Sequence, residues 1–167
     1  MADESTIEAL NRMGPAGTIT FGQAWGAIGY GDPILTATVT GQQLHDRLEE
    51  QWTTASNGTV VFAPLAVSHN VRYSFDASRP VGNRVDPADV IINGEPLDVS
   101  RNYRLATTAY TFLGADGYGA LGGYTAPFRH IRDFEGWIRY VREHPELSPS
   151  QLDRVTDKSG ASTAGAD

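Results

Sequence analysis

A strand pattern that runs without interruption into a capped helix is the feature that most constrains the fold of this chain. Residues Ile34–Val39 alternate aliphatic and hydroxyl-bearing side chains, as a β-strand does. Thr40-Gly-Gln-Gln43 then fits a capping box, which predicts a helix over residues 40–53. Apolar residues recur along that helix at a spacing of four, on one face: Leu44, Leu48 and Trp52. A strand that feeds an amphipathic helix predicts an α/β (α+β) fold.

Further elements support a single domain of helices layered on mixed β-sheet. Asn93-Gly94 between apolar runs predicts a hairpin with a type I′ turn. Val71–Phe75 and Tyr103–Ala109 are expected to be strands. Asp133 is the expected N-cap of a second long helix that reaches Glu143. Its buried stripe would consist of Phe134, Trp137, Ile138 and Val141.

The domain is expected to span residues 15–156, after a polar lead over residues 1–14. Residues 157–167 consist of Ser, Gly, Ala, Thr, Asp and one Lys, and this composition predicts a disordered tail. The start of the chain has no basic n-region followed by an apolar stretch, so no signal peptide is expected and the chain as written would be cytoplasmic. A domain cut from a larger exported protein is the alternative.

Charge and composition limit the partners. The net charge of −7 argues against binding a nucleic-acid backbone or an anionic membrane surface. No stretch approaches the ~18 apolar residues of a membrane-spanning helix. The absence of cysteine excludes disulfides and thiolate metal sites. A small-molecule ligand remains compatible with all of these properties.

One stretch suggests what that ligand is. The strand ending near Ala109 is followed by Tyr110, and six positions later a turn presents Asp116 between small residues. An aromatic face near an acceptor-only carboxylate suits a ligand made of a ring and a sugar, because the ring stacks and the hydroxyls donate hydrogen bonds. The alternative is a strand end followed by an ordinary Asp-Gly turn, which Asp116 only stabilises.

The histidines do not indicate a metal site. They are scattered along the chain, without the spacing of metal ligands: His45, His69, His130 and His144. We therefore expect no metal and no cofactor in this chain. His69 follows an irregular stretch and is the only histidine that we consider as a catalytic acid or base.

Six segments in order resemble the C-terminal, substrate-binding domain of 5'-nucleotidases and their UDP-sugar hydrolase relatives. The resemblance extends from about Leu10 to Thr156. Its most informative segment is Tyr110–Tyr118, which is similar to the family signature aromatic-Leu-x-x-Gly-Gly-Asp-Gly-Tyr. The other segments are Thr18–Asp32, Val39–Leu44, Arg72–Val85, Asn93–Asp98 and Asp133–Val155.

The resemblance implies roles for particular residues. In that family two aromatic rings clamp the base, an aspartate binds the sugar hydroxyls and arginines reach the phosphates. By position, Tyr110 corresponds to the second aromatic residue and Asp116 to the aspartate. The first aromatic position falls near Pro64, with Phe62 as the closest candidate ring, and Arg12 loosely matches one arginine. The metal ions and the catalytic His-Asp pair belong to a separate metallophosphatase domain.

The expected function is therefore that of a substrate-specificity domain of a 5'-nucleotidase-type hydrolase, which binds a nucleoside or nucleotide and lacks the metallophosphatase domain. Whether this chain is itself an enzyme stays open. One alternative is a free-standing descendant with its own activity on a nucleoside-like or other cyclic substrate, in which His69 and Tyr110 would be the working residues. Another is a partner-binding module without catalysis.

Overall fold

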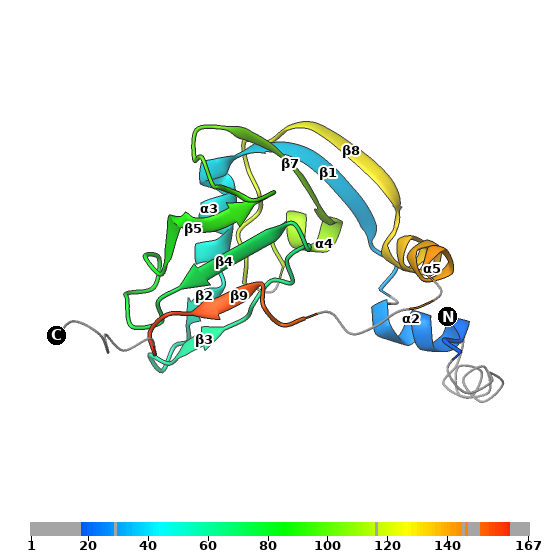
Figure 1. Cartoon of the computed structure of the whole chain (residues 1–167), viewed down its shortest axis with the longest axis horizontal. Coiled ribbons are helices and arrows are strands. Elements are labelled where there is room, and N and C mark those ends of the chain that lie inside the picture. Colours follow the sequence, from blue (N-terminus) through cyan, green and yellow to red (C-terminus); the bar gives the residue numbers. More distant parts are fainter. Residues whose placement is uncertain (1–17, 29, 116, 145, 147–150, 161–167) are drawn as a thin grey trace.

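Helices and strands alternate along the chain, as the sequence predicts. The computed structural model describes residues 18–28, 30–115, 117–144, 146 and 151–160. Mixed helices and sheets confirm the α/β class (Figure 1). In chain order the elements are α2 (Phe21–Ile28), β1 (Pro33–Thr40), α3 (Gly41–Glu49), β2 (Trp52–Thr54), β3 (Val60–Phe62), β4 (Val71–Phe75), β5 (Val85–Ile92), β6 (Glu95–Pro96), β7 (Asn102–Thr108), α4 (Ala109–Phe112), β8 (Thr125–Arg132), α5 (Asp133–Glu143) and β9 (Val155–Asp157).

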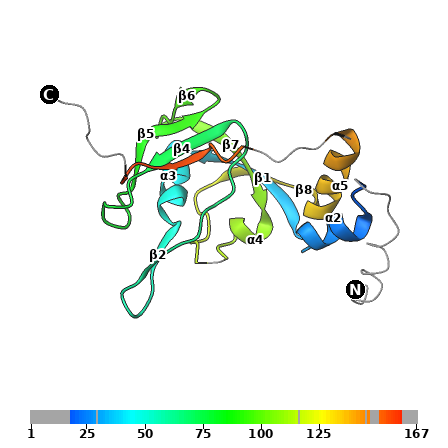
Figure 2. The same cartoon turned by 60° about the horizontal axis from the view of Figure 1, so that its bottom comes forward.

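The described strands form three sheets. One is antiparallel, with the order β7-β1-β8. The second has the order β6-β5-β4-β9, in which β9 runs parallel to β4 and the other pairs are antiparallel. The third is the β2–β3 hairpin. Figures 1 and 2 show α3 close to β4 and β5, whereas α2 and α5 lie at the opposite end of β1.

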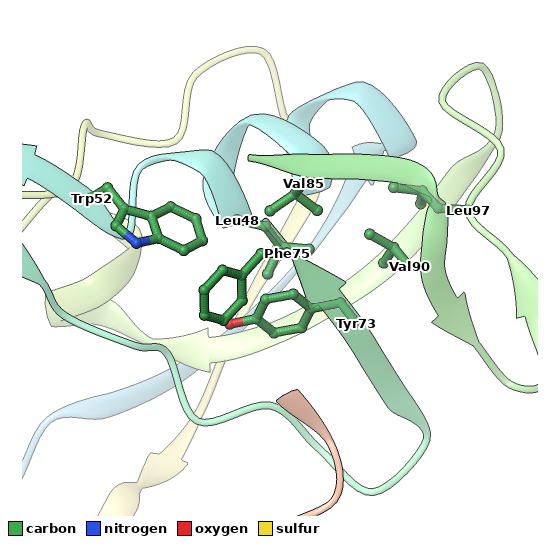
Figure 3. Close-up of a cluster of buried hydrophobic side chains, with 7 residues drawn as sticks. All are labelled: Leu48, Trp52, Tyr73, Phe75, Val85, Val90 and Leu97. Atoms are coloured by element: carbon green, nitrogen blue, oxygen red, sulfur yellow. The ribbon is translucent and has the colours of Figure 1, made fainter. Parts of the chain in front are cut away.

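The buried side chains form two clusters that meet at Leu44. The first lies between α3, β2 and the four-stranded sheet (Figure 3): Leu48, Trp52, Tyr73, Phe75, Val85, Val90 and Leu97. The second lies under β1: Ala37, Val39, Phe112 and Leu121. Leu44 packs against both clusters, so α3 connects the two halves of the core.

The junction of β1 and α3 has the predicted capping box. The Thr40 hydroxyl accepts a hydrogen bond from the Gln43 N–H at 3.2 Å, and the Gln43 side-chain oxygen accepts one from the Thr40 N–H at 2.7 Å. The helix ends at Glu49, so the predicted extent to residue 53 is too long. Trp52 instead starts β2, where it pairs with Phe62, yet its side chain is buried as expected.

Gly41 allows the start of α3 to dock on the loop before β7. Its N–H donates to the Arg101 carbonyl at 2.8 Å, and the next residue, Gln42, donates to the Val99 carbonyl at 2.9 Å. A Cβ atom added to Gly41 would lie 2.1 Å from the backbone oxygen of Asp98. Only glycine fits this approach, which ties the helix to the second half of the chain.

The second long helix, α5, has the predicted bounds, a different cap and one neighbour more than the sequence predicted. Its N-cap is Arg132, whose backbone N–H donates to the Glu135 carboxylate at 3.0 Å. Phe134 packs on Trp25 of α2 at a ring-centroid distance of 4.7 Å. Phe134 of α5 therefore meets α2, and a Cβ atom added to Gly136 would lie 3.3 Å from the Ile34 side chain of β1, so α5 packs against α2 as well as against the sheet.

The hairpin is as predicted, and the chain end holds one more strand. Asn93 and Gly94 have φ angles of 54° and 84°, as a type I′ turn requires. β9 reaches Asp157, and the Lys158 N–H donates to the Phe75 carbonyl at 2.7 Å. Backbone pairing with β4 thus orders residues beyond 156 despite their polar composition. Residues 161–167 of the expected tail and the lead over residues 1–14 lie outside the described residues.

Within the described ranges, no helix has the length and apolar character needed to cross a membrane.

The close approach at Gly41 yields a stability prediction. Gly41→Ala forces the helix start away from the loop, and we expect it to lower the free energy of unfolding by about 1–3 kcal/mol, the usual cost of overpacking. Urea denaturation measures this. Gly26→Ala is the matched control: it also adds a methyl group to a helix, nothing lies within 4 Å of the new atom, and it should stabilise by up to ~1 kcal/mol. If Gly41→Ala and Gly26→Ala change the free energy of unfolding equally, the close approach of Gly41 to the Asp98 backbone does not limit the side chain at this position.

Candidate functional site

Tyr110 stands on the short helix α4, at the end of β7. The Thr108 hydroxyl caps this helix by accepting from the Thr111 N–H. The Tyr110 backbone N–H donates to the Asp32 carboxylate at 2.5 Å, so the turn before β1 fixes the start of α4. Tyr110 is 54% exposed. Asp32 is a positioning residue that the sequence analysis included in a family segment without giving it a role.

The loop after α4 is fastened to α3. The Arg47 guanidinium donates to the Gly119 carbonyl at 2.7 Å, and the Gly119 N–H donates to the Glu50 carboxylate at 3.2 Å. Arg47 and Glu50 also form an ion pair at 2.9 Å. One salt-bridged pair at the C-terminal end of α3 therefore holds both the N–H and the C=O of one glycine in the loop.

Tyr118 connects this loop to the segment that follows β3. Its ring is buried, and its hydroxyl donates to the Ala63 carbonyl at 2.5 Å. Two regions that the sequence analysis proposed as halves of one site, around Phe62 and around residues 110–118, are thereby joined. Asp116 lies in this loop and Arg12 in the N-terminal lead, and both are outside the described residues.

Phe62 packs within an aromatic group at the edge of the core. Its ring stacks on Trp52 with a centroid distance of 4.8 Å and an interplanar angle of 9°, and it lies 5.2 Å from Phe75. Its side chain is 39% exposed. One face of Phe62 is thus occupied by Trp52, which gives the ring a structural role beside the predicted stacking on a base.

His69 lies in an exposed turn before β4. The Val71 N–H donates to the Ser68 carbonyl at 2.9 Å and closes this turn. Asn70 next to it bonds to Asn93 of the β5–β6 hairpin at 3.0 Å. The turn is well anchored, but no hydrogen bond or ion pair of the His69 ring occurs among the described residues, so its role as acid or base stays a prediction.

The segment between β3 and β4 is held in place by the amide of Gln51, which has no solvent exposure. Its oxygen accepts from the Leu65 N–H and from the Tyr73 hydroxyl, both at 2.8 Å, and its nitrogen donates to the Leu48 carbonyl at 2.7 Å. Burial raises the pKa of the Tyr73 hydroxyl, and the hydrogen bond to Gln51 offsets part of that rise. The sequence analysis missed Gln51. In a hydrophobicity pattern a polar residue is assigned to the surface, so a single buried glutamine cannot be recognised there.

A cleft of about 430 Å³ opens between α3, the segment 65–68 and the end of β7. Most of its lining is aliphatic, and its polar members are Arg47, Ser68, Thr107 and Thr111. Neither Tyr110 nor Phe62 lines it. The cleft therefore lies beside the predicted ligand residues and is a separate feature of this face.

The described residues hold no group of three or more His, Asp or Glu side chains placed to bind a metal ion. What the site offers is an exposed aromatic ring, an anchored glycine-containing loop and a nearby guanidinium.

Comparison with known proteins gives a consistent result. Residues 3–123 match the family model of the 5'-nucleotidase C-terminal domain. The chain is 29% identical over 152 residues to the trifunctional nucleotide phosphoesterase protein YfkN of Bacillus subtilis, covering 89% of this chain and 10% of that protein. It is 26% identical over 160 residues to the NAD 5'-nucleotidase of Haemophilus influenzae, covering 88% of this chain and 26% of that protein.

A solved structure agrees in fold. The 5'-nucleotidase precursor of Thermus thermophilus superposes with a TM-score of 0.68 at 22% identity, over 83% of this chain and 28% of the other. The chain thus spans between a tenth and somewhat over a quarter of the length of these relatives.

Gln51 provides a test of how the site region is held. Gln51→Leu leaves the Tyr73 hydroxyl and the Leu65 N–H without their buried partner, and each such loss costs about 1–3 kcal/mol. We expect a drop of ~2–4 kcal/mol in the free energy of unfolding, measured by urea denaturation. Adding Tyr73→Phe removes one orphaned hydroxyl and should recover part of the loss. If the changes in the free energy of unfolding caused by Gln51→Leu and Tyr73→Phe simply add in the double variant, the hydrogen bond between these two side chains contributes nothing to stability.

Proposed function

The chain belongs to the family of 5'-nucleotidase C-terminal domains, and we propose that it binds the nucleoside part of a nucleotide for a hydrolase of this type. The observation that carries the proposal is the exposed residue Tyr110, whose backbone N–H is held by Asp32, beside a loop that is anchored to α3 and to the segment after β3. A base would stack on this ring, and the carboxylate of Asp116 would accept from the ribose hydroxyls. The names of two relatives, a nucleotide phosphoesterase and an NAD 5'-nucleotidase, support this ligand class.

The proposed site gives the base and sugar more contacts than the phosphate. Arg47 is the cation closest to the anchored loop in the contacts described above, and its charge is already paired with Glu50 at 2.9 Å. Arg12 is proposed from the resemblance alone. We therefore expect binding to depend weakly on the phosphate group. We also expect it to be weaker than binding by a clamp of two rings, since one face of Phe62 already stacks on Trp52.

Hydrolysis in this proposal belongs to a metallophosphatase domain outside these 167 residues. Phosphoryl transfer in two-metal sites needs two ions held by several ligands that clamp the attacking and leaving oxygens. The role of this domain is to present the nucleotide to that site and to select its base. Tyr110 and Asp116 are then specificity residues.

Calorimetric titration with adenosine, AMP and a UDP-sugar tests the proposed site. Tyr110→Ala should weaken binding by about 1–3 kcal/mol, which is roughly 5- to 150-fold in Kd. Asp116→Ala should weaken it by ~1.5–3 kcal/mol, the value of a hydrogen bond to a charged group. Adenosine and AMP should bind with similar affinity.

Tyr140→Ala is the matched control, because Tyr140 is a similarly exposed tyrosine on α5 (47% against 54%). It should leave ligand binding unchanged. If a ligand binds and neither Tyr110→Ala nor Asp116→Ala weakens it, the assignment of these residues is wrong. If none of the three ligands binds, the domain has another role, and partner binding becomes the favoured interpretation.

A further inference from the structure

One end of the β7-β1-β8 sheet brings Arg132 close to Tyr110. Thr108, the last residue of β7, pairs with Ile34 near the start of β1. Arg132, the last residue of β8, pairs with Pro33 on the other side of β1. Neighbouring strands lie about 4.8 Å apart, so the ends of β7 and β8 are roughly 10 Å from each other. Tyr110 follows the end of β7, and β8 ends beside the start of β1 (Figure 1), so both residues border the same end of the sheet.

A single turn holds both residues. The carboxylate of Asp32 accepts from the Tyr110 N–H at 2.5 Å, and the carbonyl of the preceding residue, Gly31, accepts from the Arg132 guanidinium at 2.9 Å. A Cβ atom added to Gly31 would lie 3.3 Å from Nη1 of Arg132, so the guanidinium lies directly against the turn. Two adjacent residues therefore fix the guanidinium and the start of α4 relative to each other.

The guanidinium of Arg132 keeps most of its hydrogen-bonding capacity. β1, β7 and β8 contain no Asp or Glu. The carboxylates closest in sequence accept backbone N–H groups: Asp32, Asp133 and Glu135. Within the described part of the chain Arg132 forms no ion pair, and the bond to Gly31 is the only one that its side chain makes. Because a guanidinium has five N–H donors, most of them stay available on this exposed residue.

A group that only donates hydrogen bonds distinguishes one purine from another. Guanine presents two neighbouring acceptors, O6 and N7, on one edge, whereas adenine presents a donor amine, N6, beside N7. Arginine can donate to both acceptors of guanine at once, and it meets a donor in place of O6 when the base is adenine. Stacking on an aromatic ring does not make this distinction, since every base has a π face.

We propose that Arg132 selects the base, so that the site prefers guanosine and other nucleosides with a 6-oxopurine base over adenosine. The inference rests on the proposed nucleoside site at Tyr110. The base stacks on the Tyr110 ring, and Arg132, held against Gly31, donates to O6 and N7. The span of roughly 10 Å between the two strand ends accommodates a purine between the two side chains. The contact does not involve the phosphate, in agreement with the weak phosphate dependence expected above.

Calorimetric titrations with guanosine, inosine and adenosine test this inference. Inosine has O6 and N7 but lacks the 2-amino group of guanine, so it isolates the edge that Arg132 contacts in the proposal. We expect guanosine and inosine to bind at least ~10-fold more tightly than adenosine. Arg132→Met keeps a long apolar side chain but removes the donors, and it should abolish the preference.

Arg129→Met is the matched control, because Arg129 is an exposed arginine of the same strand that pairs with Leu35, away from the turn. This variant should keep the preference of the wild type. A purely structural role of Arg132 would lower the affinity for all three nucleosides by the same factor and leave their ratio unchanged. An unchanged ratio in Arg132→Met would therefore overturn the proposal.

The remaining outcomes separate this inference from the proposed function. If Tyr110→Ala weakens the binding of every nucleoside and the wild type shows no preference for guanosine and inosine, the nucleoside site stands and base selection by Arg132 is wrong. If Arg132→Met weakens AMP but not adenosine, the guanidinium contacts the phosphate, and this also contradicts base selection. If no nucleoside binds, the proposed function and this inference fail together.

Discussion

The buried amide of Gln51 is the interaction on which the arrangement around the site depends. It bonds the end of α3, the segment before β4 and the hydroxyl of Tyr73 at the same time. A polar group without solvent contact is costly unless its hydrogen bonds are made, so the three parts cannot separate without losing them together. The segment thus fixed is also the one that receives the Tyr118 hydroxyl, and this bond holds the loop after α4.

A second constraint acts at the other end of α3. Gly41 lets the helix approach the backbone of Asp98 more closely than any side chain would allow, and two backbone hydrogen bonds hold it there. Leu44 then reaches both buried clusters. With one end fixed by Gly41 and the other by Gln51, α3 sets the distance between the two main sheets. The cleft of about 430 Å³ is lined by residues of α3 and of both sheets.

Local signals in the sequence predicted much of this architecture. The capping box at Thr40, the turn at Asn93-Gly94 and the bounds of α5 each follow from a few adjacent residues, and the structure has all three. The helical pattern places the end of α3 too late in the chain, because Trp52 continues the helical spacing although it lies in β2. The segment Thr125–Arg132 has no strand pattern that stands out, and it pairs as β8 because the edge of β1 is open to it.

Residue type and short spacing were enough to identify the family, the local elements and the likeness of Tyr110–Tyr118 to a ligand-binding turn. Which distant residues act together follows only from the folded chain. Asp32 reaches Tyr110 across 78 positions, Tyr118 reaches Ala63 across 55, and Arg47 reaches Gly119 across 72. Contacts of this kind leave no periodic trace in a single sequence, because each joins one polar side chain to a backbone group, and every residue has a backbone. The pairing of β1 with both β7 and β8 belongs to the same class, since the order of strands exists only once the sheet has formed.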